Sequence, residues 1–271
     1  MNLSLQNLSF WHPTGPKFRD ISLELPGGSL TCLLGPNGSG KSTLLKALMR
    51  LIPLRGGGIF LRGSDGRTVD LPRLSRRELA RRLAYVPQTT PVAAVSVYEV
   101  LMMGRSPYMR IAPSRADRLI VEKNLERLGL AEWRDRHIDE LSGGERQKVL
   151  IGMALVQETP VILLDEPASS LDIRYQIELY EMLRGLCAKE EKVIVVAEHD
   201  LNLAARYSDR VCVMHGAAIV AQGTPHDVFT RMMLREVYGV DSTIGTDGQG
   251  RTTIINTGLA KDTGHLDRIV A

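Results

Sequence analysis

A glycine-rich segment between an apolar strand and a helix constrains this chain more than any other feature. The apolar run 30–34 precedes it, and the helix-compatible residues 43–50 follow it. Glycines let successive backbone N–H groups curl around a polyphosphate, and the positive end of the next helix points at the same oxygens. The segment therefore predicts a phosphate loop after a buried central strand. It fits the pattern G-x-x-x-x-G-K-[ST] and consists of Gly35, Pro36, Asn37, Gly38, Ser39, Gly40, Lys41 and Ser42.

Three side chains at the end of this loop have distinct expected roles. We expect Lys41 to reach the β and γ phosphates, Ser42 to offer its hydroxyl to Mg²⁺, and Thr43 to approach the α phosphate. The alternative is a glycine-rich turn that only joins a strand to a helix, and the complete pattern in this setting argues against it.

Two adjacent carboxylates end another apolar strand. Residues 161–164 are Val-Ile-Leu-Leu, and Asp165 and Glu166 follow them directly. Open α/β sheets bind ligands at the carboxyl ends of their strands. Asp165 suits Mg²⁺, directly or through water, and Glu166 suits a base that deprotonates the water attacking a γ phosphate. The alternative is that the pair caps the next segment or meets arginines.

The turn at residues 142–145 is a second candidate anion site. Ser142 and Glu145 have capping-box spacing before a helix-compatible stretch, and Gly143 and Gly144 expose the backbone between them. A helix N-terminus of this kind attracts anions. Taken alone, the same pattern is more often an ordinary helix cap.

Composition and charge exclude several classes of protein. The chain has 271 residues, a formal net charge of +3 and 44% hydrophobic residues, which excludes a disordered, collagen-like or coiled-coil protein. Its apolar runs stay below the ~18 residues of a membrane-spanning helix, and its first residues lack a signal-peptide pattern, which predicts a cytosolic address. Cys32, Cys187 and Cys212 lie in apolar stretches and predict reduced core thiols. The charge excess is too small to indicate nucleic acid.

The order of strand and helix signals predicts an α/β protein. Near-alternating apolar residues in the first thirty positions predict antiparallel strands, whereas the pattern from about 96 to 156 is helical. A further strand is predicted at 252–255, before a polar tail. Between them, strand signals alternate with helical stretches and predict a parallel sheet: 161–164, 193–197 and 211–214.

Six motifs in a fixed order resemble those of the ATPases of ATP-binding-cassette (ABC) transporters. They are the phosphate loop, Gln88 in Tyr-Val-Pro-Gln, the run 141–147, Asp165 with Glu166, residues 169–172, and His199. The resemblance covers about residues 2–240. It implies an α/β P-loop NTPase fold with a RecA-like core, an antiparallel β subdomain and a helical signature subdomain inserted at about 90–157. Residues 241–271 are then a C-terminal extension, either one added strand with a disordered end or an extra contact between two cassettes.

The resemblance gives each motif a role. Glu166 becomes the catalytic base, His199 the switch histidine that contacts the γ phosphate, and Gln88 the residue that senses Mg²⁺ and water. A histidine after a buried strand is otherwise more often a packed or capping residue. The signature is formed by Ser142, Gly143, Gly144 and Glu145, and Asp172 of the D-loop at 169–172 couples two sites.

The same resemblance implies that one chain carries only half of each ATP site. Two copies pack head to tail, and each ATP lies between the phosphate loop of one and the signature of the other. The implied cofactors are ATP and Mg²⁺, with the metal near Ser42, Asp165 and Gln88.

The residue that stacks on adenine is open. The family has an aromatic residue upstream of the phosphate loop where this chain has His12, preceded by Trp11 and Phe10. We expect His12 or Trp11 to contact adenine. The alternative is that Trp11 or Phe10 packs in the core of a β-hairpin.

Further strings resemble the branch that serves importers of iron chelates, haem and cobalamin. They are residues 74–80, 104–108, 199–207 and 234–240. In that branch two cassettes dock under two transmembrane permease subunits, and an external binding protein delivers the ligand. The cassette is peripheral, at the cytoplasmic face of the inner membrane. The segment 88–108 would form much of the groove for the permease, unless it is an ordinary surface turn and helix.

Three other functions compete with metal-chelate import. A molybdate or tungstate importer and an exporter-type cassette share every catalytic motif. A soluble ABC ATPase acting on nucleic acid or ribosomes usually has two cassettes or a long coiled-coil insertion. This chain has one phosphate loop and no long heptad run, so no nucleic-acid partner is expected.

Overall fold

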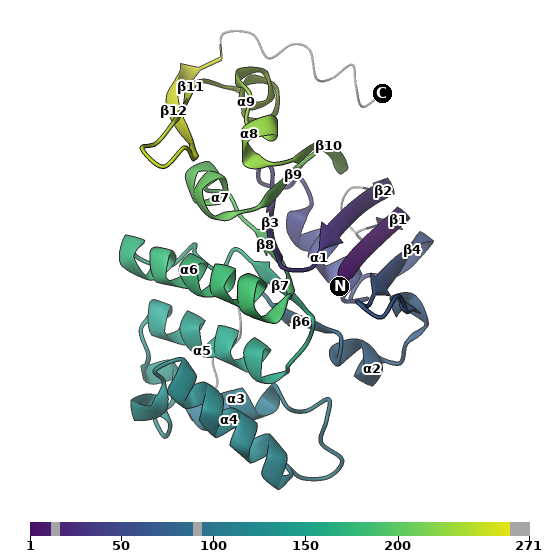
Figure 1. Ribbon diagram of the computed structural model, residues 1–271, viewed down its shortest axis with the longest axis vertical. Coiled ribbons are helices and arrows are strands. Elements are labelled where there is room, and N and C mark those ends of the chain that lie inside the picture. The colour runs from purple at the N-terminus through teal and green to yellow at the C-terminus, as the bar shows by residue number, and fades with distance from the viewer. Residues whose placement is uncertain (12–16, 89–93, 261–271) are drawn as a thin grey trace.

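A six-stranded sheet runs through the centre of the computed structural model, which describes residues 1–11, 17–88 and 94–260 (Figure 1). Its strand order is β10-β9-β3-β8-β7-β6, and all pairs are parallel except β10 with β9. This confirms the expected parallel sheet, whereas β10 was not predicted. The strands are β3 (Ser29–Leu34), β6 (Leu83–Val86), β7 (Val161–Asp165), β8 (Val193–Ala197), β9 (Arg210–His215) and β10 (Ala218–Gly223).

An antiparallel sheet lies beside the central one and confirms the expected antiparallel start. Its order is β2-β1-β4-β5, and β1 pairs with both β2 and β4. The alternating apolar residues of β1 and β2 point into the molecule, because successive side chains of a strand face opposite sides. The strands are β1 (Asn2–Trp11), β2 (Lys17–Pro26), β4 (Leu54–Arg62) and β5 (Thr68–Asp70).

The helices between β6 and β7 form a layer of their own, as the helical pattern of this stretch predicts (Figure 1). In this layer α3 and α4 pack on each other and on α5. Serine capping boxes begin four of the helices, at Ser75, Ser96, Ser114 and Ser142. The helices are α1 (Lys41–Leu48), α2 (Arg76–Ala80), α3 (Val97–Met103), α4 (Arg115–Arg127), α5 (Gly143–Val156), α6 (Ile173–Glu190), α7 (Leu201–Tyr207), α8 (Pro225–Val228) and α9 (Arg231–Tyr238).

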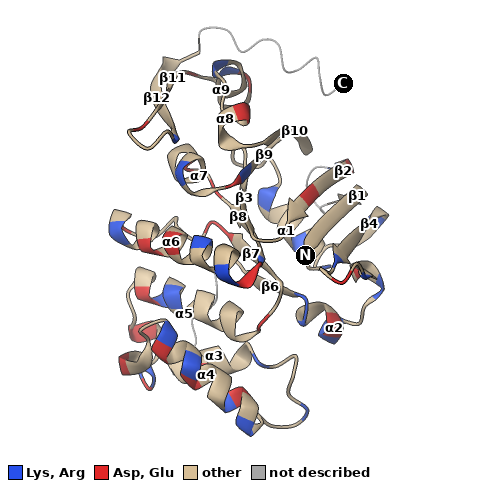
Figure 2. Cartoon of the chain, viewed as in Figure 1, with Lys and Arg blue, Asp and Glu red and all other residues tan. Residues whose placement is uncertain are grey.

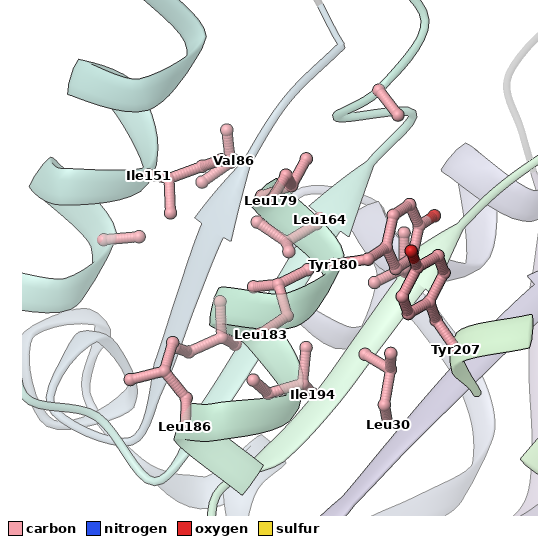
Figure 3. Close-up of a cluster of buried hydrophobic side chains, with 14 of the residues drawn as sticks. Leu30, Val86, Ile151, Leu164, Leu179, Tyr180, Leu183, Leu186, Ile194 and Tyr207 are labelled. Carbon is pink, nitrogen blue, oxygen red and sulfur yellow. The ribbon is translucent and has the colours of Figure 1, made fainter. Parts of the chain in front are cut away.

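The central sheet separates two hydrophobic cores. In β8, Ile194 and Val196 face the core under α5 and α6, whereas Val193, Val195 and Ala197 face the core shared with α1 and the antiparallel sheet. Figure 3 shows part of the first core, with side chains of α6 packed on the sheet. The three cysteines are buried free thiols, as expected. Both faces of the sheet are thus covered, and the loops at its strand ends remain for ligands.

The C-terminal part adds a two-stranded antiparallel hairpin. Strand β11 (Val240–Thr246) pairs with β12 (Thr252–Leu259), so the predicted strand at 252–255 is confirmed but its partner was missed. Asn202 of α7 holds β12 with two hydrogen bonds: its amide donates to the Ile254 carbonyl (3.0 Å) and accepts from the Ile254 N–H (2.9 Å). The buried Ile254 side chain joins the core beside it.

Candidate functional site

The phosphate loop joins the end of β3 to the start of α1, as predicted. Gly40 is the N-cap of α1 and has a left-handed backbone (φ 104°). A methyl group at Gly40 would overlap the ring of Phe18, and one at Gly35 (φ 145°) would overlap the Met214 carbonyl. Both positions therefore require glycine, for backbone conformation and for space.

The side chain of Lys41 is folded back into its own loop. Its Nζ donates to the carbonyls of Gly35 (2.7 Å) and Pro36 (3.3 Å), and the residue is only 5% exposed. Burial lowers the pKa of the Lys41 ammonium, and the nearby Glu166 and Asp165 carboxylates act in the opposite direction. The hydroxyl of Ser39 is buried in the same loop with no partner among the described residues. The loop thus holds a buried lysine and a buried hydroxyl that has no hydrogen-bond partner among the described residues.

Ser42 and Asp165 meet at the start of α1 and the end of β7. The Ser42 hydroxyl donates to Asp165 Oδ1 (2.8 Å), and the Tyr85 hydroxyl of β6 donates to Asp165 Oδ2 (3.1 Å). Asp165 is 2% exposed. Burial raises the pKa of the Tyr85 hydroxyl, and the neighbouring Asp165 carboxylate raises it further. A hydroxyl and a carboxylate oxygen are ligands that Mg²⁺ accepts, with the rest of its octahedron supplied by phosphate and water. No cluster of three or more His, Cys, Asp or Glu side chains suited to a metal occurs in the described part of the chain. The Ser42 and Asp165 pair fits Mg²⁺ bound with a nucleotide.

Glu166, Gln88 and His199 come together at the same edge of the sheet. Gln88 Nε2 donates to Glu166 Oε2 (2.7 Å), and His199 Nδ1 lies 4.0 Å from the same oxygen. Glu166 has a left-handed backbone (φ 49°), a conformation that costs a non-glycine residue about 1–3 kcal/mol. Its N–H donates to the Ala197 carbonyl at the end of β8 (3.0 Å), which holds this conformation. The three residues predicted to be catalytic are therefore adjacent.

The signature residues form the start of α5, in a different layer from the phosphate loop (Figure 1). The Ser142 hydroxyl and N–H donate to Glu145 Oε2 (2.8 and 2.9 Å), and these bonds lower the pKa of the Glu145 carboxyl. The capping box is thus confirmed. The N–H groups of Gly143 and Gly144 have no hydrogen-bond partner among the described residues. Helix α1 packs on β7, whereas α5 packs on α3, α4 and β6.

The D-loop connects Glu166 to α6. Ser169 donates its hydroxyl to the Glu166 carbonyl (3.0 Å), and Asp172 caps α6 by accepting the Tyr175 N–H (3.0 Å). A methyl group added at Gly143 would come within 3.9 Å of Ser170, so the signature turn and the D-loop are neighbours.

The aromatic residues upstream of the phosphate loop differ in burial. Phe10 is fully buried and stacks on Phe18 with ring centroids 4.5 Å apart, so it is a core residue. Trp11 is 39% exposed, with Lys17 Nζ and the Arg55 guanidinium 5.5 and 4.9 Å from its ring centroid. His12 lies outside the described residues. Trp11 is accessible, so it remains a predicted adenine contact.

Two residues of the site were missed by the sequence analysis. Tyr85 donates to Asp165, and Glu198 lies buried directly before His199. Tyr85 stands three residues before Gln88 in the strand next to Asp165, and this proximity was a usable signal. Glu198 directly follows the apolar run 193–197, and no motif covered it.

Fold and site together define a P-loop nucleotide hydrolase with an added helical layer, in which α5 begins with two N–H groups that have no partner among the described residues. The ABC transporter family profile matches residues 18–169. The chain belongs to this family, whose ATP-binding subunits are ATPases coupled to transport, and it is such an ATPase.

Individual relatives agree with this assignment. The iron(3+)-hydroxamate import ATP-binding protein of Bacillus subtilis (strain 168) is 35% identical over 251 residues, which cover 91% of each chain. An ABC transporter assigned to the metal-chelate type, solved in an inward-facing conformation, has a similar fold. Its TM-score is 0.81 at 25% identity, over 94% of this chain and 97% of that one. A bacterial ABC transporter cassette solved as a dimer has a TM-score of 0.70 at 25% identity, over 82% of this chain and 98% of that one.

Proposed function

We propose that this chain is the ATP-hydrolysing subunit of an importer that carries a metal chelate, an iron–siderophore complex in the first instance, through a separate permease. The observation that supports hydrolysis is the contact of Glu166 with Gln88 beside Asp165, Ser42 and His199. The observation that supports import of a chelate is the identity with an iron(3+)-hydroxamate import protein over 91% of this chain.

The geometry of the site supports the following roles for its residues. Lys41 and the N–H groups of the loop bind the phosphates, and Ser42 and Asp165 would hold Mg²⁺, assisted by Gln88. The metal would neutralise charge on the β and γ phosphates. Glu166 accepts the proton of the attacking water, because it is an anion held in place by Gln88 and by its main-chain bond to Ala197. His199, whose Nδ1 lies 4.0 Å from Glu166 Oε2, would contact the γ phosphate.

A complete site needs a second copy of the chain. The N–H groups of Gly143 and Gly144 have no partner among the described residues, and a helix start of this kind binds anions. In its own chain this helix start belongs to the layer of α3 to α5, away from α1. We therefore infer that it binds the phosphates held by a partner copy, with Asp172 at the contact. A relative that was solved as a dimer supports an assembly of two copies.

We propose that the permease docks on the segment 88–108, of which residues 89–93 lie outside the described residues. Its last residues are fixed from α2: Arg77 and Arg81 both donate to the Pro107 carbonyl (2.8 and 2.9 Å). Basic and acidic residues are interspersed on α4 and α5, the helices that pack on α3 of this segment (Figure 2), so shape and position rather than one sign of charge would select this partner. No helix in the described ranges is long and apolar enough to cross a membrane. The proposed place is the cytoplasmic face of the membrane, as a peripheral subunit.

Two experiments test the proposal. Glu166→Gln should bind ATP normally and lose at least ~100-fold in turnover, because the water loses its base. Turnover near that of the unchanged protein would contradict the role of Glu166. For cargo, cells lacking the gene should lose uptake of a ⁵⁵Fe-loaded hydroxamate siderophore and regain it with the intact gene but not with Glu166→Gln. Loss of molybdate uptake alone would instead indicate an oxyanion importer.

A further inference from the structure

A buried carboxylate directly before the switch histidine has no part in the mechanism above. Glu198 follows β8 and is 1% exposed. Burying a charge is costly unless hydrogen bonds or a partner charge compensate it. Within residues 1–11, 17–88 and 94–260, no lysine or arginine lies within 4 Å of its oxygens, and His199 Nδ1 at 3.5 Å is the nearest basic group.

Three neutral donors hold this carboxylate. The Tyr180 hydroxyl donates to Oε2 (2.6 Å), and the N–H groups of His199 (2.9 Å) and Asp200 (3.2 Å) both donate to Oε1. One oxygen thus binds two successive N–H groups of the turn between β8 and α7. These bonds fix the main chain that carries the imidazole of His199.

The carboxylate is itself held by rigid elements. Tyr180 of α6 is fully buried, and its ring stacks on Tyr207 at the end of α7 with centroids 5.2 Å apart (Figure 3). The N–H of Glu198 donates to the Leu33 carbonyl of β3 (3.0 Å), two residues before the phosphate loop. Glu198 therefore connects three elements: α6, the turn between β8 and α7 that carries His199, and β3, which precedes the phosphate loop.

We propose that Glu198 is a positioning residue, which holds the main chain of His199 so that the imidazole stays at the γ-phosphate side of Glu166. The imidazole makes no hydrogen bond to any described residue, so its place depends on the main chain that carries it. This inference rests on the proposed role of His199 in hydrolysis. Glu198 is the group through which α6 and β3 position the histidine.

The test is a double-mutant cycle in the full-length chain, with ATP turnover and binding of a fluorescent ATP analogue as readouts. We expect Glu198→Ala to lower kcat about tenfold and to change nucleotide affinity less than about threefold. Glu198→Gln keeps an acceptor for both N–H groups and should retain at least about half of kcat. In the His199→Ala background, Glu198→Ala should have no further effect, because a residue that acts through His199 has nothing left to position. Leu234→Ala, a buried change in α9, is the control for lowered stability and should leave kcat unchanged.

Three results would overturn the inference. Glu198→Ala could lower kcat as much in the His199→Ala background as in the unchanged protein. Glu198→Ala and Leu234→Ala could lower kcat equally, or Glu198→Ala could leave kcat unchanged. Tyr180→Phe is the second variant, should Glu198→Ala fail to fold. It removes one bond to Oε2, and we expect a fall of about threefold that disappears in the His199→Ala background. Failure of the proposed function is distinguishable, since His199→Ala alone would then turn over ATP like the unchanged protein.

Discussion

Replacing Arg105 by alanine should destabilise the helical layer far more than removal of an exposed charge. Arg105 follows α3, and its side chain is 5% exposed. Its Nε donates to Asp117 Oδ1 at the start of α4 (2.9 Å), and its Nη1 donates to the Val156 carbonyl at the end of α5 (2.7 Å) and to Glu158 Oε2 (2.9 Å). One guanidinium therefore ties three helices together.

The expected loss of stability in Arg105→Ala follows from what each partner of the guanidinium loses. Removing one member of a buried ion pair costs about 3–5 kcal/mol, because the other charge stays buried. Asp117 keeps two bonds from the Ser114 hydroxyl and N–H, so we expect the low end, about 3 kcal/mol. Glu158 has 54% of its side chain exposed, and Glu158→Gln should cost about 0.5 kcal/mol or less.

Urea unfolding measures the difference in stability between Arg105→Ala and Glu158→Gln. The chain has two tryptophans, so Trp11→Phe leaves Trp133, next to α5, as the fluorescent reporter of the helical layer. In that background Arg105→Ala should lower the free energy of unfolding several times more than Glu158→Gln. Asp117→Asn added to Arg105→Ala should recover part of the loss, because the uncompensated charge is gone. Equal costs below about 1 kcal/mol for both single variants would refute the reasoning.

Three further predictions concern the phosphate loop, the helix caps and the C-terminal hairpin. Gly40→Ala should weaken binding of a fluorescent ATP analogue at least ~10-fold, because it combines positive φ with overlap of Phe18; Gly66→Ala, at φ 78° in open space, should leave binding unchanged. The pKa of Asp117 is held low by the Ser114 hydroxyl first and by Arg105 to a lesser extent. The unfolded chain therefore takes up this proton at higher pH than the folded one. This contribution to stability is complete above about pH 4 and is lost as the pH falls further. With Ser114→Ala, the free energy of unfolding should therefore fall less steeply as the pH is lowered. Asn202→Ala removes both bonds to Ile254 and should increase hydrogen exchange of the β12 amides, with about 1–3 kcal/mol less protection; unchanged exchange would show that the hairpin is held by packing alone.

The position of most site residues could be predicted because of one topological rule. The carboxyl ends of parallel strands lie at the same edge of a sheet, so loops after β3, β6, β7 and β8 must meet there. Gln88, Glu166 and His199 each follow one of these strands within two residues, and Ser42 lies at the start of α1, directly after the loop that follows β3. The sequence does not reveal the order of the strands, because β3 pairs with β8 and β9, which lie far along the chain.

The features that were missed depend on partners rather than on local pattern. Strand β11 has few apolar residues, and its pairing with β12 and packing on α9 make it a strand. Tyr85 is a single polar residue in the apolar strand β6, and Glu198 directly follows the apolar strand β8, positions that also fit an ordinary strand edge or strand end. Their roles come from contacts with Asp165 and Tyr180, 80 and 18 residues away in the chain. A motif specifies the residues that touch the phosphates, whereas the residues that hold those groups in place need only a suitable donor or acceptor in the neighbouring element. A different pair of residues could supply the same support, so sequence spacing carries little signal for them.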